Sequence, residues 1–175
     1  YYTDYQIVDD GEQETVQCSY IENGQNVIEG VIGNSITWDS TTVDLYRTTN
    51  AGGGQTVYFL SNEDIIASRD MSYSFSNLTA CEEIELNNFH ITSSTTYLNY
   101  LFNECNSLKE IDLSNFDTSN VTNMSYLFFG CSSLENIVGL NQIETASNTQ
   151  FQYMFGECSS LSEIDLSNFD TSSAT

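Results

Sequence analysis

The sequence predicts an α/β solenoid, a parallel sheet with short helices on its convex side, preceded by a small antiparallel β domain. Two observations predict the solenoid: the string LKEIDLSNF at 108–116 returns as LSEIDLSNF at 161–169, and the hydrophobic period changes half-way through each copy. A third observation, the turn dipeptides of the first 65 residues, predicts the β domain.

Four copies of one repeat fill the C-terminal part of the chain. They begin at Met71, Leu98, Met124 and Phe151, so successive starts are 27, 26 and 27 residues apart. This spacing is typical of leucine-rich repeats. We therefore predict a solenoid over residues 66–175, divided into repeats 71–97, 98–123, 124–150 and 151–175.

Each copy predicts a short helix followed by a strand. In the third copy Met124, Leu127, Phe128 and Cys131 are spaced i, i+3, i+4 and i+7, one face of a helix. In the second copy, Ile111 and Leu113 alternate across the polar Asp112, as in a strand. The predicted strands are 83–86, 110–113, 136–140 and 163–166, and their buried column is Ile84, Ile111, Ile137 and Ile164.

Stacking is required because one unit cannot fold alone. A unit buries about seven apolar side chains, each worth ~1.5–3 kcal/mol. Ordering its backbone costs ~1–2 kcal/mol for each of about 26 residues. The units must therefore share their cores with neighbours. We also expect an exposed apolar edge on the fourth unit.

Residues 1–65 predict a meander of five or six antiparallel strands. Asp10-Gly11 and Asn23-Gly24 separate apolar, strand-like runs, and such dipeptides are strong hairpin signals. A glycine run at 52–54 leads into QTVYFL. We expect this domain to cap the first unit of the solenoid, with the boundary between residues 61 and 70.

Composition excludes some partners. The chain has 3 Lys and Arg against 25 Asp and Glu, a formal charge of -22, so nucleic acid is excluded as a partner because its phosphates are bound by cations. No apolar run approaches the ~20 residues that span a bilayer, so no membrane insertion of this segment is expected. Because the chain begins at Tyr1 and stops inside the fourth repeat, we expect a processed product or a piece of a longer protein.

The string DLSNFDTSNVTNMSYLFFGCSSLENI at 112–137 resembles the BspA-like leucine-rich repeat of bacterial and protist surface proteins. The resemblance covers 71–175. Two departures are the insertion of Gly139 in the third copy and His90 where other copies have an acid. The resemblance implies a cell-surface or secreted protein with an adhesion role, and it does not fix a ligand.

No enzyme and no cofactor are predicted. Hydrolase, dinucleotide-binding and metalloprotease motifs are missing from the sequence. His90, the single histidine, has no predictable catalytic partner, and we interpret it as an exposed turn residue.

The repeated cysteines predict packing. Cys105, Cys131 and Cys158 share one repeat position, which is Leu78 in the first copy, so the site is apolar and buried. A disulfide between stacked neighbours remains the alternative. Zinc is not expected because no CxxC occurs.

Two surfaces are candidates for binding. Parallel strands place equivalent carboxylates ~4.8 Å apart, and two such charges repel by ~3 kcal/mol at an effective dielectric of ~20. Raised carboxylate pKa values, a basic protein partner or weakly bound Ca²⁺ would answer this repulsion; alternatively, solvent and salt screen an inactive surface. This acidic face consists of Glu83, Glu85, Glu110, Asp112, Glu163 and Asp165.

The second surface is a tyrosine column. Its rings stack between the predicted helices or contact a partner. The column consists of Tyr73, Tyr100, Tyr126 and Tyr153. Near it, Thr96, Thr122 and Thr149 are expected to cap the helices.

These features favour a non-enzymatic extracellular or cell-surface module for adhesion or protein binding. The alternative is a structural subunit of a surface filament, fibre or virion appendage built by repeat-mediated assembly. In the first case the partner is another protein; in the second the chain self-associates into a homo-oligomer or fibre.

Overall fold

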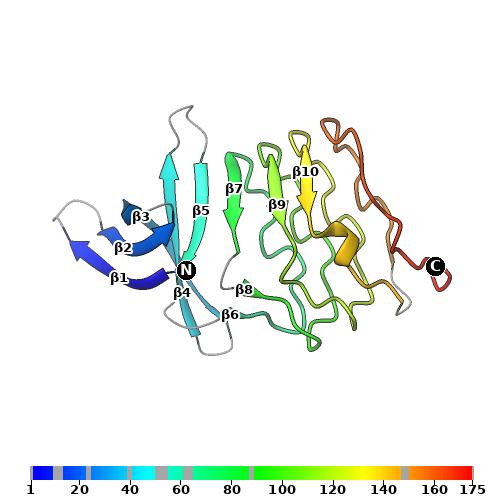
Figure 1. Ribbon diagram of the computed structural model, residues 1–175, viewed down its shortest axis with the longest axis horizontal. Helices are drawn as coiled ribbons and strands as arrows, with labels where there is room; N and C mark the ends of the chain where they lie inside the picture. The colour runs from blue at the N-terminus through cyan, green and yellow to red at the C-terminus, as the bar shows by residue number, and fades with distance from the viewer. Residues whose placement is uncertain are drawn as a thin grey trace.

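The fold is described by a computed structural model (Figure 1). It gives the backbone of five strands within residues 2–60. Backbone and side chains are described for residues 65–86, 89–146 and 150–174. The four repeat copies are called coil 1 (71–97), coil 2 (98–123), coil 3 (124–150) and coil 4 (151–175).

The N-terminal strands form an antiparallel meander in chain order: β1 (Tyr2–Asp9), β2 (Glu14–Glu22), β3 (Gln25–Trp38), β4 (Thr41–Thr49) and β5 (Gln55–Leu60). The hairpin dipeptides Asp10-Gly11 and Asn23-Gly24 lie outside the described residues. β5 then pairs in parallel with β7 of coil 1, so meander and repeats share one eight-stranded sheet (Figure 1).

The coils contribute parallel strands to that sheet: β7 (Cys81–Glu85), β9 (Glu110–Asp112) and β10 (Asn136–Val138). A second, two-stranded sheet joins β6 (Ile65–Ile66) to β8 (Phe89–His90), and a single 3-10 turn, η1 (Leu140–Gln142), follows β10. Residues 163–166 of coil 4, predicted as a strand, do not form one. His90 is half-buried in β8 and is therefore not the exposed turn residue that we expected.

The core runs through the coils as columns of equivalent side chains. Ile84 and Ile111 are 5% and 1% exposed, Ile137 is half-buried, and Ile164 is 37% exposed. The predicted column is thus buried in coils 1 and 2 and opens toward coil 4. A parallel column of phenylalanine rings stacks beside it, with Phe102 and Phe128 5.4 Å apart between ring centroids.

The predicted short helices are wrong. Residues 71–77, 98–104, 124–130 and 151–157 form consecutive turns. In coil 2, Leu101 N donates to Leu98 O within the coil (3.2 Å), whereas Tyr100 N donates to Ser125 O of coil 3 (3.0 Å). Because every second amide points along the stack, the i to i−4 bonds of an α-helix cannot form. The bonds that close these turns span three residues, so the apolar residues three apart in each coil resemble those of a helix.

Side chains also join neighbouring coils. Cys105, Cys131 and Cys158 each donate from Sγ to the carbonyl of a phenylalanine one coil earlier, at 3.1 Å. The three thiols are free; Cys105 and Cys131 are buried, as the packing interpretation predicts, and Cys158 is half-buried. The neighbouring Cys105 thiol and burial raise the pKa of Cys131, and burial raises that of Cys158 to about 11.

Sequence reasoning chose the wrong threonines. Thr96 and Thr122 have no helix to cap, and Thr149 lies outside the described residues. Instead, the buried Thr118 hydroxyl accepts from Glu144 N (2.8 Å) and donates to Glu144 O (3.1 Å). Thr145 makes the same pair of bonds to Asp170 of coil 4. A threonine directly follows Asp117 and Glu144. This recurrence could have predicted that these threonines join the coils.

Candidate functional site: a hollow sheet face and a tyrosine ladder

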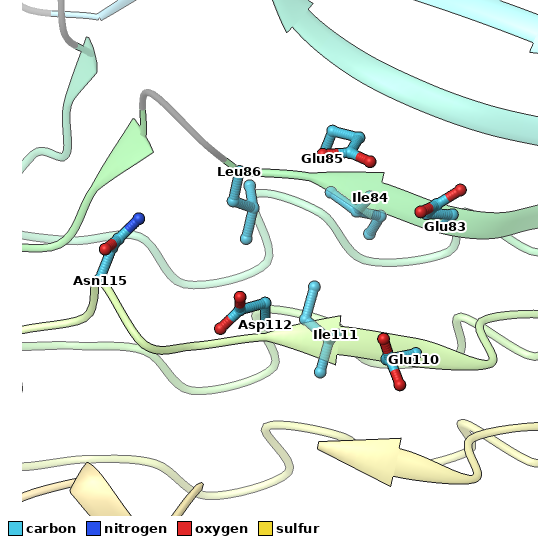
Figure 2. Close-up of a pocket in the computed structure, with 8 residues that line it drawn as sticks. All are labelled: Glu83, Ile84, Glu85, Leu86, Glu110, Ile111, Asp112 and Asn115. Atoms are coloured by element: carbon cyan, nitrogen blue, oxygen red, sulfur yellow. The ribbon is translucent and has the colours of Figure 1, made fainter. Parts of the chain in front are cut away.

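A hollow of about 190 Å³ lies on the sheet between β7 and β9 (Figure 2). Ile84, Leu86 and Ile111 also line it, although these residues are at most 6% exposed. Figure 2 shows Glu83 and Glu110 toward one end of the two strands and Asp112 with Asn115 toward the other. We call this feature the acidic hollow; its carboxylates belong to Glu83, Glu85, Glu110 and Asp112.

Strand geometry places these groups. Side chains alternate along β7, so Glu83 and Glu85 flank the inward Ile84. β7 and β9 pair at Glu83 and Glu110 alone, whereas β9 and β10 pair over three residues. The single pair holds two strands together at one end and leaves a gap further along, which is the hollow.

Polar neighbours engage part of the acidic hollow. Asn136 Nδ2 donates to Glu110 Oε2 (2.6 Å), and Ser114 N donates to Asp112 Oδ1 (2.8 Å). Lys109 Nζ lies 3.1 Å from Glu82 Oε2, a carboxylate outside the hollow. The single lysine of the sequence therefore pairs away from the hollow.

The rest of the predicted acidic face lies apart. Glu163 and Asp165 line a second hollow of about 220 Å³, formed with β10 and the residues after it. Asn136 and Val138 of β10 separate the two sets of acids. The structure thus brings four of the six predicted residues together and leaves two on coil 4.

The expected rise in carboxylate pKa is wrong for Asp165. Hydrogen bonds from Ser167, one of them from its backbone N at 2.9 Å, lower the pKa of this carboxyl. A local turn therefore stabilises the charged form of an exposed group. Among the described residues, no group of three His, Cys, Asp or Glu side chains could hold a metal ion.

The four predicted tyrosines form a continuous stack, which we call the tyrosine ladder (Tyr73, Tyr100, Tyr126, Tyr153). Successive ring centroids lie 4.5, 4.6 and 5.2 Å apart, with interplanar angles of 6°, 8° and 28°. The end rings of Tyr73 and Tyr153 are 55% and 64% exposed. Burial, followed by the neighbouring Tyr73 and Tyr126 phenols, raises the pKa of Tyr100.

All four ladder residues have a left-handed backbone, with φ between 53° and 63°. This conformation is uncommon for a bulky residue. It could not be predicted from the residue type, because the usual markers of a left-handed backbone are Gly and Asn. Phe129 packs its edge against Tyr126 and Tyr153 at the coil 4 end of the ladder.

The comparisons place the repeats in a family. A family model described as "Mycoplasma protein of unknown function, DUF285" matches residues 69–175, and the chain belongs to this family. The family is one of surface-associated proteins, and its description leaves the activity open. No curated protein and no solved structure matched the chain. In the part of the chain that the structure describes, we found no helix with the length and apolar character needed to cross a membrane.

Proposed function

We propose that this chain is a non-enzymatic binding module at the cell surface or outside the cell, in which residues 66–175 form a leucine-rich-repeat solenoid and the sheet face binds a protein. The uncovered sheet face with its acidic hollow carries this proposal. Family membership supports the surface location.

The hollow suits a lysine or arginine side chain of the partner. Such a side chain carries a charged head on a long stem, and the charged head matches the carboxylates of the acidic hollow. A bound cation would also relieve the repulsion between Glu83 and Glu110, which are direct neighbours across β7 and β9. Because rim charges mainly guide association, binding should weaken as salt increases.

Binding of a fluorescent peptide of alternating lysine and leucine tests the proposal. In the hollow variant, Glu83, Glu85 and Glu110 are replaced by Gln, while Asp112 stays because it closes the turn at Ser114. We expect about tenfold weaker binding, a loss of about 1.4 kcal/mol. The matched control replaces three exposed glutamates outside the hollow: Glu135, Glu144 and Glu157.

The control changes the net charge equally, so it measures non-specific attraction. Equal losses in the two variants would show that the peptide follows total charge, and would refute the sheet-face site. A chelator should leave binding unchanged; loss of binding on chelation would favour the calcium alternative.

The structural alternative is a filament or fibre subunit built by repeat-mediated assembly. It is favoured by coil 4, where Ile164 and Leu166 are exposed. There the amides of Tyr153 and Phe155 also have no acceptor among the described residues, although their equivalents in coil 3, Tyr126 and Phe128, donate to coil 4. Electron microscopy of the concentrated chain tests it: regular filaments would support assembly, and dispersed particles would count against it.

A further inference from the structure

The ladder position is occupied by tyrosine in every coil, although its left-handed backbone is unfavourable for a bulky residue. A left-handed backbone costs a residue other than Gly ~1–3 kcal/mol. The second left-handed position of the coils varies, with Asn77, Glu104, Gly130 and Glu157 in turn. The ladder position is Tyr in all four coils.

Stacking inside the molecule accounts for part of this choice. An aromatic pair contributes ~0.5–1.5 kcal/mol beyond its buried area, and the four rings form three pairs. The left-handed strain falls on any residue other than Gly, as it does on Glu104 and Glu157 at the second position. What the tyrosines add is a row of outward ring edges and hydroxyls, ending in two exposed rings.

The residues on either side of each ladder tyrosine in the sequence are uncharged. The residues preceding the four tyrosines are Ser72, Asn99, Ser125 and Gln152, and the residues following them are Ser74, Leu101, Leu127 and Met154. The sheet face carries carboxylates instead. In a chain with a formal charge of -22, a second copy meets less repulsion at an uncharged strip than at an acidic one.

The spacing of the ladder also fits a second copy. Two ladders of one sequence have the same spacing, so all four rungs can meet together in a two-fold antiparallel arrangement. Tyr73 then lies opposite Tyr153 of the other copy, and Tyr100 opposite Tyr126. Two-fold dimers present the same surface from both subunits, and stacked aromatic rows form tight lateral contacts between repeating structures.

We propose that the tyrosine ladder is a self-association surface through which two copies of this chain pair side by side. No ladder residue lines either hollow, so this contact is separate from the proposed sheet-face site.

Sedimentation velocity over a concentration series tests the proposal. The ladder variant combines Asn99→Asp with Gln152→Glu, two isosteric changes that place charge beside the ladder. The control variant combines Asn120→Asp with Gln142→Glu, the same changes at exposed positions away from the ladder and from both hollows. We expect at least about tenfold weaker dimerisation for the ladder variant, or about 1.4 kcal/mol, and little change for the control.

Salt supplies a second measurement. Added salt screens the repulsion between two acidic copies, so dimerisation of the native chain should strengthen with salt, opposite to peptide binding at the acidic hollow. A native chain that stays monomeric at every concentration and salt level overturns the proposal. Equal weakening of both variants, or association unchanged in the ladder variant, also overturns it. Matching melting curves of the variants would show that folding is not the cause.

Discussion

Coils 2 and 4 contain the same string, IDLSNF, in two different environments. In coil 2, Ile111 and Leu113 are each 1% exposed, and residues 110–112 form β9 between two neighbouring strands. In coil 4, Ile164 and Leu166 are 37% and 39% exposed, and residues 163–166 form no strand. Identical residues therefore become core or surface according to their neighbours, as expected when stability comes from stacking.

The largest expected difference is between Ile111→Ala and Ile164→Ala. The first empties a buried site and should cost about 2–5 kcal/mol of unfolding free energy. The second removes a side chain that is already more than a third exposed, and should cost less than about 1 kcal/mol. Urea unfolding of both variants measures the difference. Equal costs would show that coil 4 is as well packed as coil 2.

Removing a threonine hydroxyl should also cost more stability in coil 2 than in coil 4, by a smaller amount. Thr118→Val leaves Glu144 N and O without their partner, and should cost about 1–3 kcal/mol. Thr171→Val, at the equivalent but exposed position of coil 4, should change stability by less than about 0.5 kcal/mol. Thermal unfolding can compare the two. A neutral Thr118→Val would mean that the hydroxyl does not join the coils.

Tyr100 allows backbone strain and stacking to be separated. Tyr100→Ala loses the ring and keeps the left-handed strain, whereas Tyr100→Gly loses the ring and relieves it. We expect the Gly variant to be more stable than the Ala variant by about 1 kcal/mol, measured by urea unfolding. The reverse order, typical of a helix interior, would argue against the turn structure.

The smallest expected effect concerns Cys158 at high pH. Burial raises its pKa from 9.0 to about 11 in the folded chain. Folding therefore favours the neutral thiol, and this contribution to stability is complete below pH 9 and is lost as the pH rises toward 11. Cys158→Ala should flatten the part of the stability-against-pH curve between pH 9 and 11. An unchanged slope would show that the thiol titrates alike in both states.

The sequence predicted the parallel strands of coils 1 and 2 because apolar and acidic residues alternate there with period two, and it predicted that of coil 3 because Ile137 holds the equivalent position. It could not separate helices from turns, since Met124, Leu127 and Phe128 have the spacing that both produce. The left-handed tyrosines were equally unpredictable, because their conformation follows from amides that bond to the next coil.

Part of the candidate site was within reach of the sequence. The acids of Glu83, Glu110 and Asp112 alternate with core residues, which predicts a shared face. The gap between β7 and β9 depends on how far two strands pair, and no local pattern encodes that. The division of the acids by Asn136 and Val138 was visible in the sequence, although the prediction still counted Glu163 and Asp165 in one face.

The parallel pairing of β5 with β7 has a consequence for synthesis on the ribosome, where N-terminal units emerge and fold first. The meander can form from its own antiparallel pairs. The edge of β5 is then available for pairing before coil 1, which contains β7, is complete. The strand of each new coil pairs with the strand of the preceding coil, which already sets its register. The loop that must close is therefore short. Synthesis from the N-terminus thus allows a parallel sheet, a structure that usually folds slowly, to form by adding one neighbouring strand at a time.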